Sequence, residues 1–394
     1  MASNGQHESS NSITKNNKKQ VRVFDFKRFK KRHIALKILY LGWNYRGFVT
    51  QEDTEQTIEK FVFEALMKTK LIEDRATSNY HRCGRTDKGV SAFSQVISID
   101  VRCNAKFGTG VITPDGYTGN DDKDDQKSEL NYCKILNRVL PPDIRCTAWS
   151  PVPVGFSARF DCKLRTYKYF FPLGNLDVNR MRKAALYLVG EHDFRNICKM
   201  DVNNGVTNYM RKIIEVTIEN INDENDGYQL HVLTVKGQAF LWHQVRCIVA
   251  LLFLVGENKE EPEIIEKLLN VQEMPCKPQY AMAAELPLVL FNCEFDENDV
   301  KEWVHDEEAE DDLIKHMQGL WFQEVAKATI IKSMLDSLES RRKEKKIKEQ
   351  TSQLTMGVKR SVYMPLLKRH VCESLEDRIS KVESKKKAKL TANS

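Results

Sequence analysis

Residues 81–102 read HRCGRTDKGVSAFSQVISIDVR, and the fold prediction starts from this stretch. From Ile97 to Val101 apolar and polar residues alternate, which is the period of two that is typical of a β-strand. The preceding residues 83–92 form a loop in which two glycines surround an Arg-Thr-Asp core. A tight turn before a strand can hold a carboxylate in a defined direction, so Asp87 is a candidate functional side chain.

The sequence on either side of this stretch predicts a mixed fold. Upstream, IALKILYL from residue 34 predicts a buried strand, and apolar residues at helical spacing between Ile58 and Leu66 predict a helix. Downstream, RTYKYFF, YQLHVLTVKG and PLVLFNCEF predict strands, while FLWHQVRCIVALLFLV predicts a helix. Strands and helices alternate without a strict βα rhythm, which predicts an α+β architecture.

Composition divides the 394 residues into segments. The expected core comprises an N-terminal half and a C-terminal half, and the other segments are polar or strongly charged. In chain order we expect a disordered N-terminus (1–20), a basic flank (21–33), the N-terminal half with its surface insertion (34–160, insertion 104–128), the C-terminal half (161–300), an acidic helical region (301–340) and a basic tail (341–394).

Charge is segregated along the chain. The net charge is +7 for residues 1–33 and +10 for residues 341–394, which leaves −11 for the rest of a chain whose total is +6. Basic ends indicate a polyanionic partner, so the acidic core would need a local basic patch to bind one.

Several functional classes lack their usual motifs. The sequence has no phosphate-binding P-loop, no dinucleotide fingerprint, no zinc-protease motif, no nucleophile elbow and no apolar run long enough to cross a bilayer. Its ten cysteines are scattered singly, without C-x-x-C spacing. We therefore expect no metal site, no cofactor and no membrane association, and we interpret Cys83 as a packing residue.

Asp87 and Arg85 are the residues of the loop that could carry chemistry. A neighbouring guanidinium should lower the pKa of Asp87 and orient it, which would make the carboxylate a fixed anionic nucleophile. The alternative interpretation is an ordinary surface turn, because turns favour these residue types anyway.

Four motifs extend the interpretation. Residues 84–92 (GRTDKGVSA) resemble the signature loop of the TruA class of tRNA pseudouridine synthases. Three further segments are similar to motifs of that family in the same order: YLGWNYRGF at 40–48, FSARF with RTYKY at 156–169, and GQAFL running into Val245-Arg246. Together the motifs cover the chain from about Ile34 to Phe295.

The resemblance implies a pseudouridine synthase fold, in which two similar halves share a mixed central sheet, with helices outside and a basic active-site cleft. It implies that Asp87 is the catalytic aspartate, Arg85 its ion-pair partner, Tyr167 an aromatic that stacks on the target base, and Arg246 a second basic residue near the carboxylate. Tyr167 could instead be a half-buried core residue, and Arg246 the polar face of an apolar helix. Where the family commonly has A-P-x-x-G-L-x-L, this chain has AAELPLVL, so the pocket wall expected at Leu288 differs in shape.

The predicted function is therefore isomerisation of uridine in tRNA, in the anticodon stem-loop at positions 38 and 39, a location that rests on the resemblance alone. Members of the class are dimers, and the sequence of this chain neither indicates nor contradicts a homodimer. The basic segments predict import into the nucleus, with the cytoplasm as a second location.

Two alternatives to the predicted enzymatic function remain. One is a non-catalytic tRNA-binding or tRNA-folding protein on the same fold, and the other is a nuclear scaffold held by its basic ends. Every matched motif precedes Phe295, which predicts that turnover does not need the basic tail.

Overall fold

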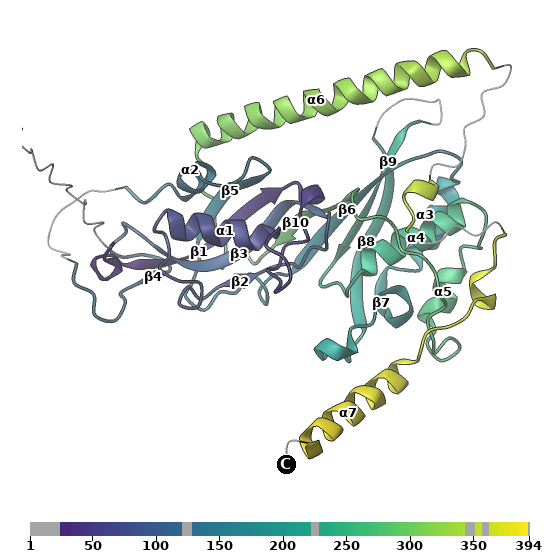
Figure 1. Ribbon diagram of the computed structural model, residues 1–394, viewed down its shortest axis with the longest axis horizontal. Coiled ribbons are helices and arrows are strands. Elements are labelled where there is room, and N and C mark those ends of the chain that lie inside the picture. Colours follow the sequence, from purple (N-terminus) through teal and green to yellow (C-terminus); the bar gives the residue numbers. More distant parts are fainter. Residues whose placement is uncertain (1–23, 120–127, 222–227, 343–350, 357–361, 393–394) are drawn as a thin grey trace, which may run out of the picture.

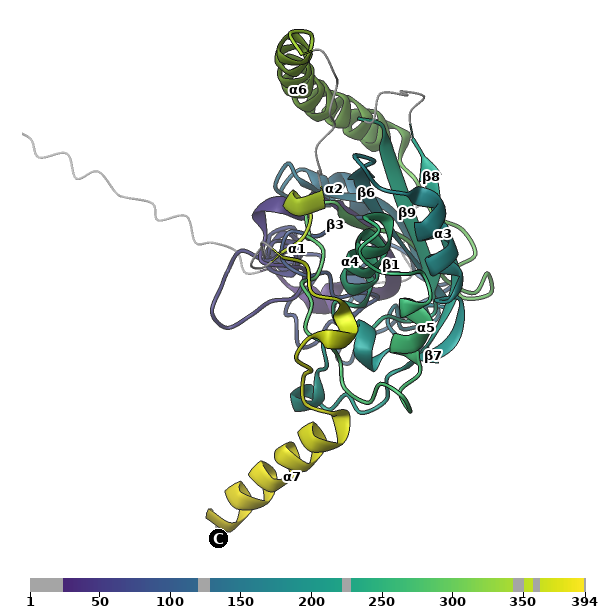
Figure 2. The same ribbon diagram turned by 90° about the vertical axis from the view of Figure 1, so that its right-hand side faces the viewer.

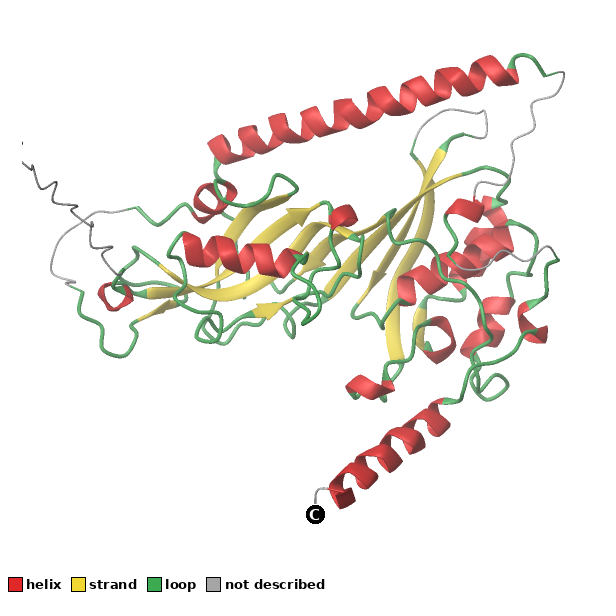
Figure 3. Ribbon diagram, in the orientation of Figure 1, coloured by secondary structure: helices red, strands yellow, loops and turns green. Residues whose placement is uncertain are grey.

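The computed structural model describes residues 24–119, 128–221, 228–342, 351–356 and 362–392 (Figure 1). Its centre is a 10-stranded sheet in which the neighbouring strands run in the order β4-β1-β3-β10-β6-β9-β8-β7, with β5 paired to β1 and β2 to β3 (Figure 3). The strands are β1 (Lys31–Tyr40), β2 (His81–Arg82), β3 (Ser91–Arg102), β4 (Val111–Ile112), β5 (Ile144–Pro151), β6 (Leu164–Pro172), β7 (Gly190–Asp193), β8 (Met210–Asn220), β9 (Leu230–Gly237) and β10 (Leu288–Glu294).

Helices pack beside both halves of the sheet, and the two longest lie at the periphery (Figures 1 and 2). The helices are α1 (Ile58–Lys68), α2 (Tyr132–Asn137), α3 (Val178–Leu186), α4 (Gln244–Gly256), α5 (Ile264–Leu269), α6 (Glu307–Glu339) and α7 (Leu375–Ala392). Helix α6 runs along one side of the molecule and α7 projects away from it. No helix in the described ranges is both long enough and apolar enough to cross a membrane.

The sheet joins two hydrophobic cores, one in each half. Strand β10 pairs in parallel with β3 of the N-terminal half and antiparallel with β6 of the C-terminal half. It also contributes to both cores, because Leu290 is buried in the N-terminal core and Leu288 in the C-terminal core. The predicted two-half architecture around a mixed sheet is confirmed, and the two halves meet at β10.

Some predicted boundaries differ from the structure. Strand β1 begins at Lys31, within the predicted basic flank, and Val111 and Ile112 of the predicted insertion pair with β1 as strand β4. Helix α4 begins at Gln244, four residues after Phe240, because His243 adopts a left-handed backbone conformation with φ of 59°. This bend determines the direction of the His243 side chain.

The predicted basic tail contributes to the folded core. Leu366 and Leu375 are buried in the C-terminal core. Residues 354–356 lie beside residues 282–284, with Ala284 N donating to Leu354 O over 2.6 Å and Met356 N to Met282 O over 2.9 Å. This changes the expectation that turnover does not need residues 341–394, because deleting them would expose apolar core surface.

Candidate active site

The signature loop (residues 84–92) is held by hydrogen bonds to β1 and to the turn after it. The Tyr40 hydroxyl and Thr86 Oγ1 are 2.6 Å apart, and Phe48 N donates to Thr86 O over 3.1 Å. Gly89 N donates to Tyr45 O over 3.1 Å. The loop is therefore fixed from one side by residues of the 40–48 motif.

Two glycines permit this packing. A Cβ at Gly42 would lie 1.9 Å from Val90 O, so only glycine lets the two segments approach this closely. Gly89 has φ of +78° in a turn closed by a hydrogen bond from Val90 N to Asp87 O. A positive φ at the third position of such a turn favours glycine and turns the chain directly after Asp87.

Asp87 faces the N-terminus of helix α4. His243 Nε2 lies 3.4 Å and an Arg246 terminal nitrogen 4.0 Å from Asp87 Oδ2. His243 is the N-cap of α4 and Arg246 follows in its first turn, where the helix dipole also favours a negative charge. The carboxyl group is 25% exposed, so it lies in a recess that solvent still reaches.

Arg246 is shared between two carboxylates. One terminal nitrogen donates to Glu285 Oε2 over 2.8 Å, and its Nε donates to Ala283 O over 2.8 Å. Met356 Sδ lies 2.7 Å from the same terminal nitrogen. These contacts fix the guanidinium in one orientation, with the other terminal nitrogen directed to Asp87.

Burial and the neighbouring side chains act in opposite directions on the pKa of Asp87. Burial raises the pKa of Asp87 above its ordinary value, and the charge of Glu285 raises it further. The pKa is lowered in part by Arg246, Trp242 and Lys199, but the net shift is upward. Burial together with the nearby cations lowers the pKa of His243 to about 4, so its imidazole is neutral at pH 7. The site thus combines a partly desolvated carboxylate, a neutral imidazole and an anchored guanidinium.

Comparisons with known proteins identify the family of this chain. A family model described as tRNA pseudouridine synthase matches residues 184–296. A bovine tRNA pseudouridine(38/39) synthase is 48% identical over 92% of this chain and 79% of its own length. The human protein of the same name is 47% identical with the same coverage, and a tRNA pseudouridine synthase A of Methanosarcina acetivorans is 31% identical over 70% of this chain and 88% of its own.

The chain belongs to the TruA-type family of tRNA pseudouridine synthases. It is therefore an isomerase whose substrate is tRNA. Among solved structures, a chain of an H/ACA ribonucleoprotein bound to a substrate RNA aligns at 12% identity, but its TM-score of 0.22 is too low to support a shared fold.

The predicted ion pair between Arg85 and Asp87 is wrong. Both residues are described, and the structure has no salt bridge between them, because the Arg85 side chain is exposed. Partial burial, and after it the charges of Arg82 and Arg159, lower the pKa of Arg85. The prediction that Asp87 has a lowered pKa is also wrong, because burial raises the pKa of this carboxyl more strongly than the nearby cations lower it. In this tRNA pseudouridine synthase Arg246, rather than Arg85, is the guanidinium nearest the carboxylate.

Tyr167 and Leu288 occupy neighbouring strands of the pseudouridine synthase. Tyr167 is half-buried in β6, packs against both cores and contacts Phe240 edge to face with ring centroids 5.1 Å apart. Burial raises the pKa of its hydroxyl. Leu288 is 4% exposed and packs in the C-terminal core. Tyr167 is thus held by packing where the halves meet, and Leu288 is a residue of the C-terminal core.

Two residues of the site were missed by reasoning from sequence. His243 was assigned to the interior of a helix, and nothing in the sequence indicated its left-handed conformation. Glu285 occurs in the AAELPLVL segment that departs from the family pattern, and that departure was the available signal. Its methylene chain packs on Gly89, where an added Cβ would lie 2.6 Å from Glu285 Cγ.

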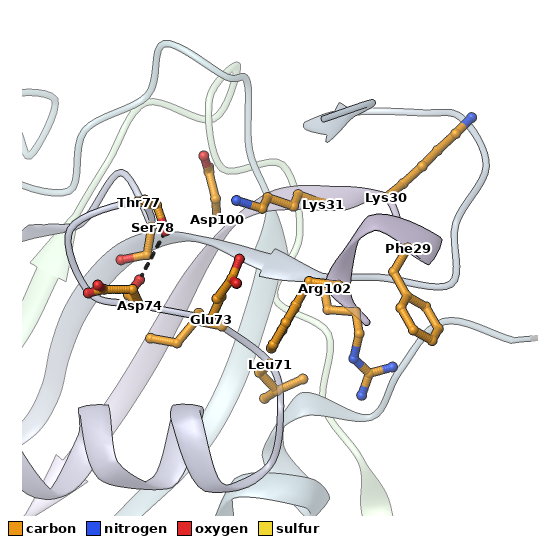
Figure 4. A pocket seen from close by; sticks show the side chains of 12 residues that line it. Phe29, Lys30, Lys31, Leu71, Glu73, Asp74, Thr77, Ser78, Asp100 and Arg102 are labelled. Atoms are coloured by element: carbon orange, nitrogen blue, oxygen red, sulfur yellow. Dashed lines mark hydrogen bonds between the residues drawn. The ribbon is translucent and has the colours of Figure 1, made fainter. Parts of the chain in front are cut away.

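A separate hollow lies at the other end of the synthase, beside the basic flank (Figure 4). It is lined by Phe29, Leu71, Asp74 and Arg102 among others, and its volume of about 10 Å³ leaves room for no more than a water molecule. Arg102 lies over the stacked rings of Phe24 and Phe29. These aromatic residues of the flank therefore pack against β3.

Proposed function

We propose that this synthase converts uridines at positions 38 and 39 of the tRNA anticodon stem-loop to pseudouridine. The names of the bovine and human relatives support the positions, and the placement of Asp87 in the signature loop, facing the N-terminus of α4, is the observation that supports the chemistry. Uridine and pseudouridine are isomers, so the reaction consumes no oxidant, nucleotide or other cofactor.

The residues have separate proposed roles. The Asp87 carboxylate acts on the nucleotide while the glycosidic bond breaks and re-forms at carbon, and Arg246 orients that carboxylate. The ring of Tyr167 stacks on the detached base, with Leu288 supporting the pocket wall. Arg85 lies near Arg82 and Arg159, and this group of positive charges beside Asp87 suits RNA phosphates.

The test is chemical mapping of pseudouridine in tRNA incubated with the purified full-length protein and no added cofactor. We expect modification at positions 38 and 39, and no modification in transcripts that carry cytidine there. Modification confined to other positions would contradict the proposed substrate while leaving the enzyme class intact.

The pH dependence of turnover should respond to Glu285. Glu285 raises the pKa of Asp87, so Glu285→Gln removes that effect and leaves Arg246 free to lower the pKa further. If the carboxylate is the active form, the acid limb of the pH–rate profile shifts to lower pH. Single-turnover rates measured across the acid range check this. Glu294→Gln is the matched control, because Glu294 pairs with Lys236 outside the site. An acid limb that stays in place or moves to higher pH would contradict the assignment.

Helix α7 is proposed as a tRNA contact. Lys385, Lys386 and Lys387 are exposed on α7, which projects from the body. Each phosphate contact releases counterions and contributes a slope of about −0.7 to −0.9 in a log–log plot of affinity against salt. Replacing all three lysines by Gln should weaken tRNA binding at low salt and flatten this slope by up to about 2 to 3, while turnover at saturating tRNA is preserved. An unchanged salt slope would exclude the contact.

We propose the nucleus, with the cytoplasm as a second location, as the place of action. The support is the clustering of Lys and Arg in the basic tail, part of which, residues 343–350, lies outside the described residues. The distribution of a fluorescent fusion of the full chain, compared with the triple lysine variant, tests whether α7 contributes to import. Equal nuclear levels of the two fusions would exclude that contribution.

We propose a homodimer that pairs through α6. None of the residues of α6 is buried, although several are large and apolar. The side chains of Ile314, Trp321 and Ile331 are 50%, 67% and 65% exposed. Together with Met317 and Leu338 they occupy a and d positions of a heptad repeat, in which Glu324 and Ala328 fill the two positions between Trp321 and Ile331. Met317 also lines an apolar cavity of about 470 Å³ together with residues of the sheet such as Tyr40, Phe93 and Phe171.

The variant Trp321→Glu with Ile331→Glu should be monomeric where the wild type is a dimer. Buried charges opposed across a helix seam are unfavourable, so we expect the mass in sedimentation equilibrium to fall by half. Gln323→Glu, on an exposed position away from the stripe, should leave the dimer intact. A monomeric wild type at micromolar concentration would overturn the proposal.

A further inference from the structure

Three cysteines that stand alone in the sequence meet at one point in the structure. Cys83 precedes the signature loop, Cys162 precedes β6, and Cys293 lies in β10. Their Sγ atoms all lie within 4.8 Å of one another, and Cys83 Sγ is 3.2 Å from Cys293 Sγ. All three are free thiols and at most 8% exposed.

The spacing of these sulfur atoms fits one metal ion. A metal with sulfur ligands at about 2.3 Å holds three of them roughly 3.8 to 4.0 Å apart, in tetrahedral or trigonal geometry. Cys83 Sγ and Cys293 Sγ lie 3.2 Å apart and no two of the three sulfur atoms are more than 4.8 Å apart, so side-chain rotations that shift each Sγ by about 1 Å or less would complete the site. Thiolate sulfur is a soft ligand that selects thiophilic ions such as Zn²⁺ and Cu⁺.

A positive side chain lies beside the three sulfurs. The Arg165 guanidinium donates to Cys83 O over 3.1 Å and is close to Cys162 O at 3.5 Å. In β10, Cys293 is the register partner of Arg165. Three thiolates around a monovalent or divalent ion leave a net negative charge, which a fixed guanidinium offsets in this buried position.

A second pair of buried cysteines lies in contact but lacks a third metal-binding side chain. Cys133 and Cys146 also lie 3.2 Å apart, between α2 and β5. In the described part of the chain, no third thiol, imidazole or carboxylate joins that pair to form a metal-binding group. The pair can be explained by packing and S–H···S contact alone, and it supplies a matched control.

We propose that Cys83, Cys162 and Cys293 form a structural site for one thiophilic d¹⁰ metal ion, Zn²⁺ or Cu⁺. Binding forms three metal–sulfur bonds and releases the protons of the coordinating thiols to solvent, with no change of oxidation state. The ion would tie the start of the signature loop to β6 and β10, and so would join the two halves four residues from Asp87. The isomerisation itself would not involve the ion.

The experiment uses the full-length protein, reduced and freed of metal, and titrates it with Zn²⁺ and separately with Cu⁺ held by a chromophoric competitor. Native mass spectrometry gives the number of ions per chain, and thermal unfolding gives the stabilisation that binding produces. We expect one ion per chain for at least one of the two metals, together with a higher unfolding temperature. Cys162→Ser should weaken binding at least about 100-fold and abolish the thermal shift, while Cys133→Ser should bind as the wild type does.

If Cys162→Ser does not fold, the absorption of Cd²⁺ bound to the wild-type protein tests the site instead. Cd²⁺ bound by thiolates has a charge-transfer absorption whose intensity reports the number of coordinating sulfurs, and three are expected. Cys293→Ala is the second variant and should lose one of them. Absence of binding by both metals, or an ion retained at full affinity in Cys162→Ser and Cys293→Ala, would overturn the site.

Discussion

Asp87→Asn protein is expected to fold and to bind tRNA but to form no pseudouridine. The substitution preserves the size of the side chain and removes its charge in a recess that His243 and Arg246 arrange around a carboxylate. Losing the central reacting group of an enzyme costs roughly 10³-fold or more in rate. Single-turnover assays give the rate, and filter binding gives the affinity.

Asp115→Asn is the matched control for this experiment. Asp115 is an exposed aspartate in the irregular segment before residue 120, and it should retain full turnover. Turnover of Asp87→Asn within about tenfold of the wild type would remove Asp87 from the chemistry, and loss of tRNA binding together with turnover would indicate misfolding instead.

Arg246→Ala is expected to reduce both turnover and stability. The change leaves Glu285 and Ala283 O without their partner. Breaking a fully buried ion pair costs about 3 to 5 kcal/mol in the free energy of unfolding, and the loss here should be smaller because Glu285 is 25% exposed. It also removes the positive charge nearest Asp87, so we expect turnover to fall about 10² to 10³-fold. Urea unfolding midpoints and single-turnover rates measure the two effects.

The double variant Arg246→Ala with Glu285→Ala separates the two roles. It removes both charges, so most of the lost stability should return. Turnover should stay low, because the carboxylate of Asp87 still lacks its orienting cation. Recovery of turnover in the double variant would mean that Arg246 serves only to neutralise Glu285.

The structural features that were predictable from sequence are those that depend on the pattern of neighbouring residues. The alternation from Ile97 to Val101 became β3, and the apolar spacing from Ile58 to Leu66 became α1. Residues 84–92 formed a tight turn because Gly89 tolerates a positive φ. Such features are encoded within a few residues, so periodicity and turn chemistry were enough to find them.

The electrostatic partner of Asp87 could not be found in that way. Arg85 is two residues away in sequence, yet its side chain is exposed, because neighbouring residues of a turn point in different directions. Arg246 is brought to Asp87 by the packing of α4 against the signature loop. Burial then outweighs that charge and raises the pKa of Asp87, and burial is a property of the assembled fold.

Sequence by itself determined the fold class and the family motifs, among them the loop that contains Asp87. The tertiary structure alone decided which side chains surround that carboxylate, that Leu366 and Leu375 of the basic tail belong to the core, and that Cys83, Cys162 and Cys293 converge. The physical reason is distance along the chain. Cys83 and Cys293 are 210 residues apart and come together only because β10 closes the sheet between β3 and β6.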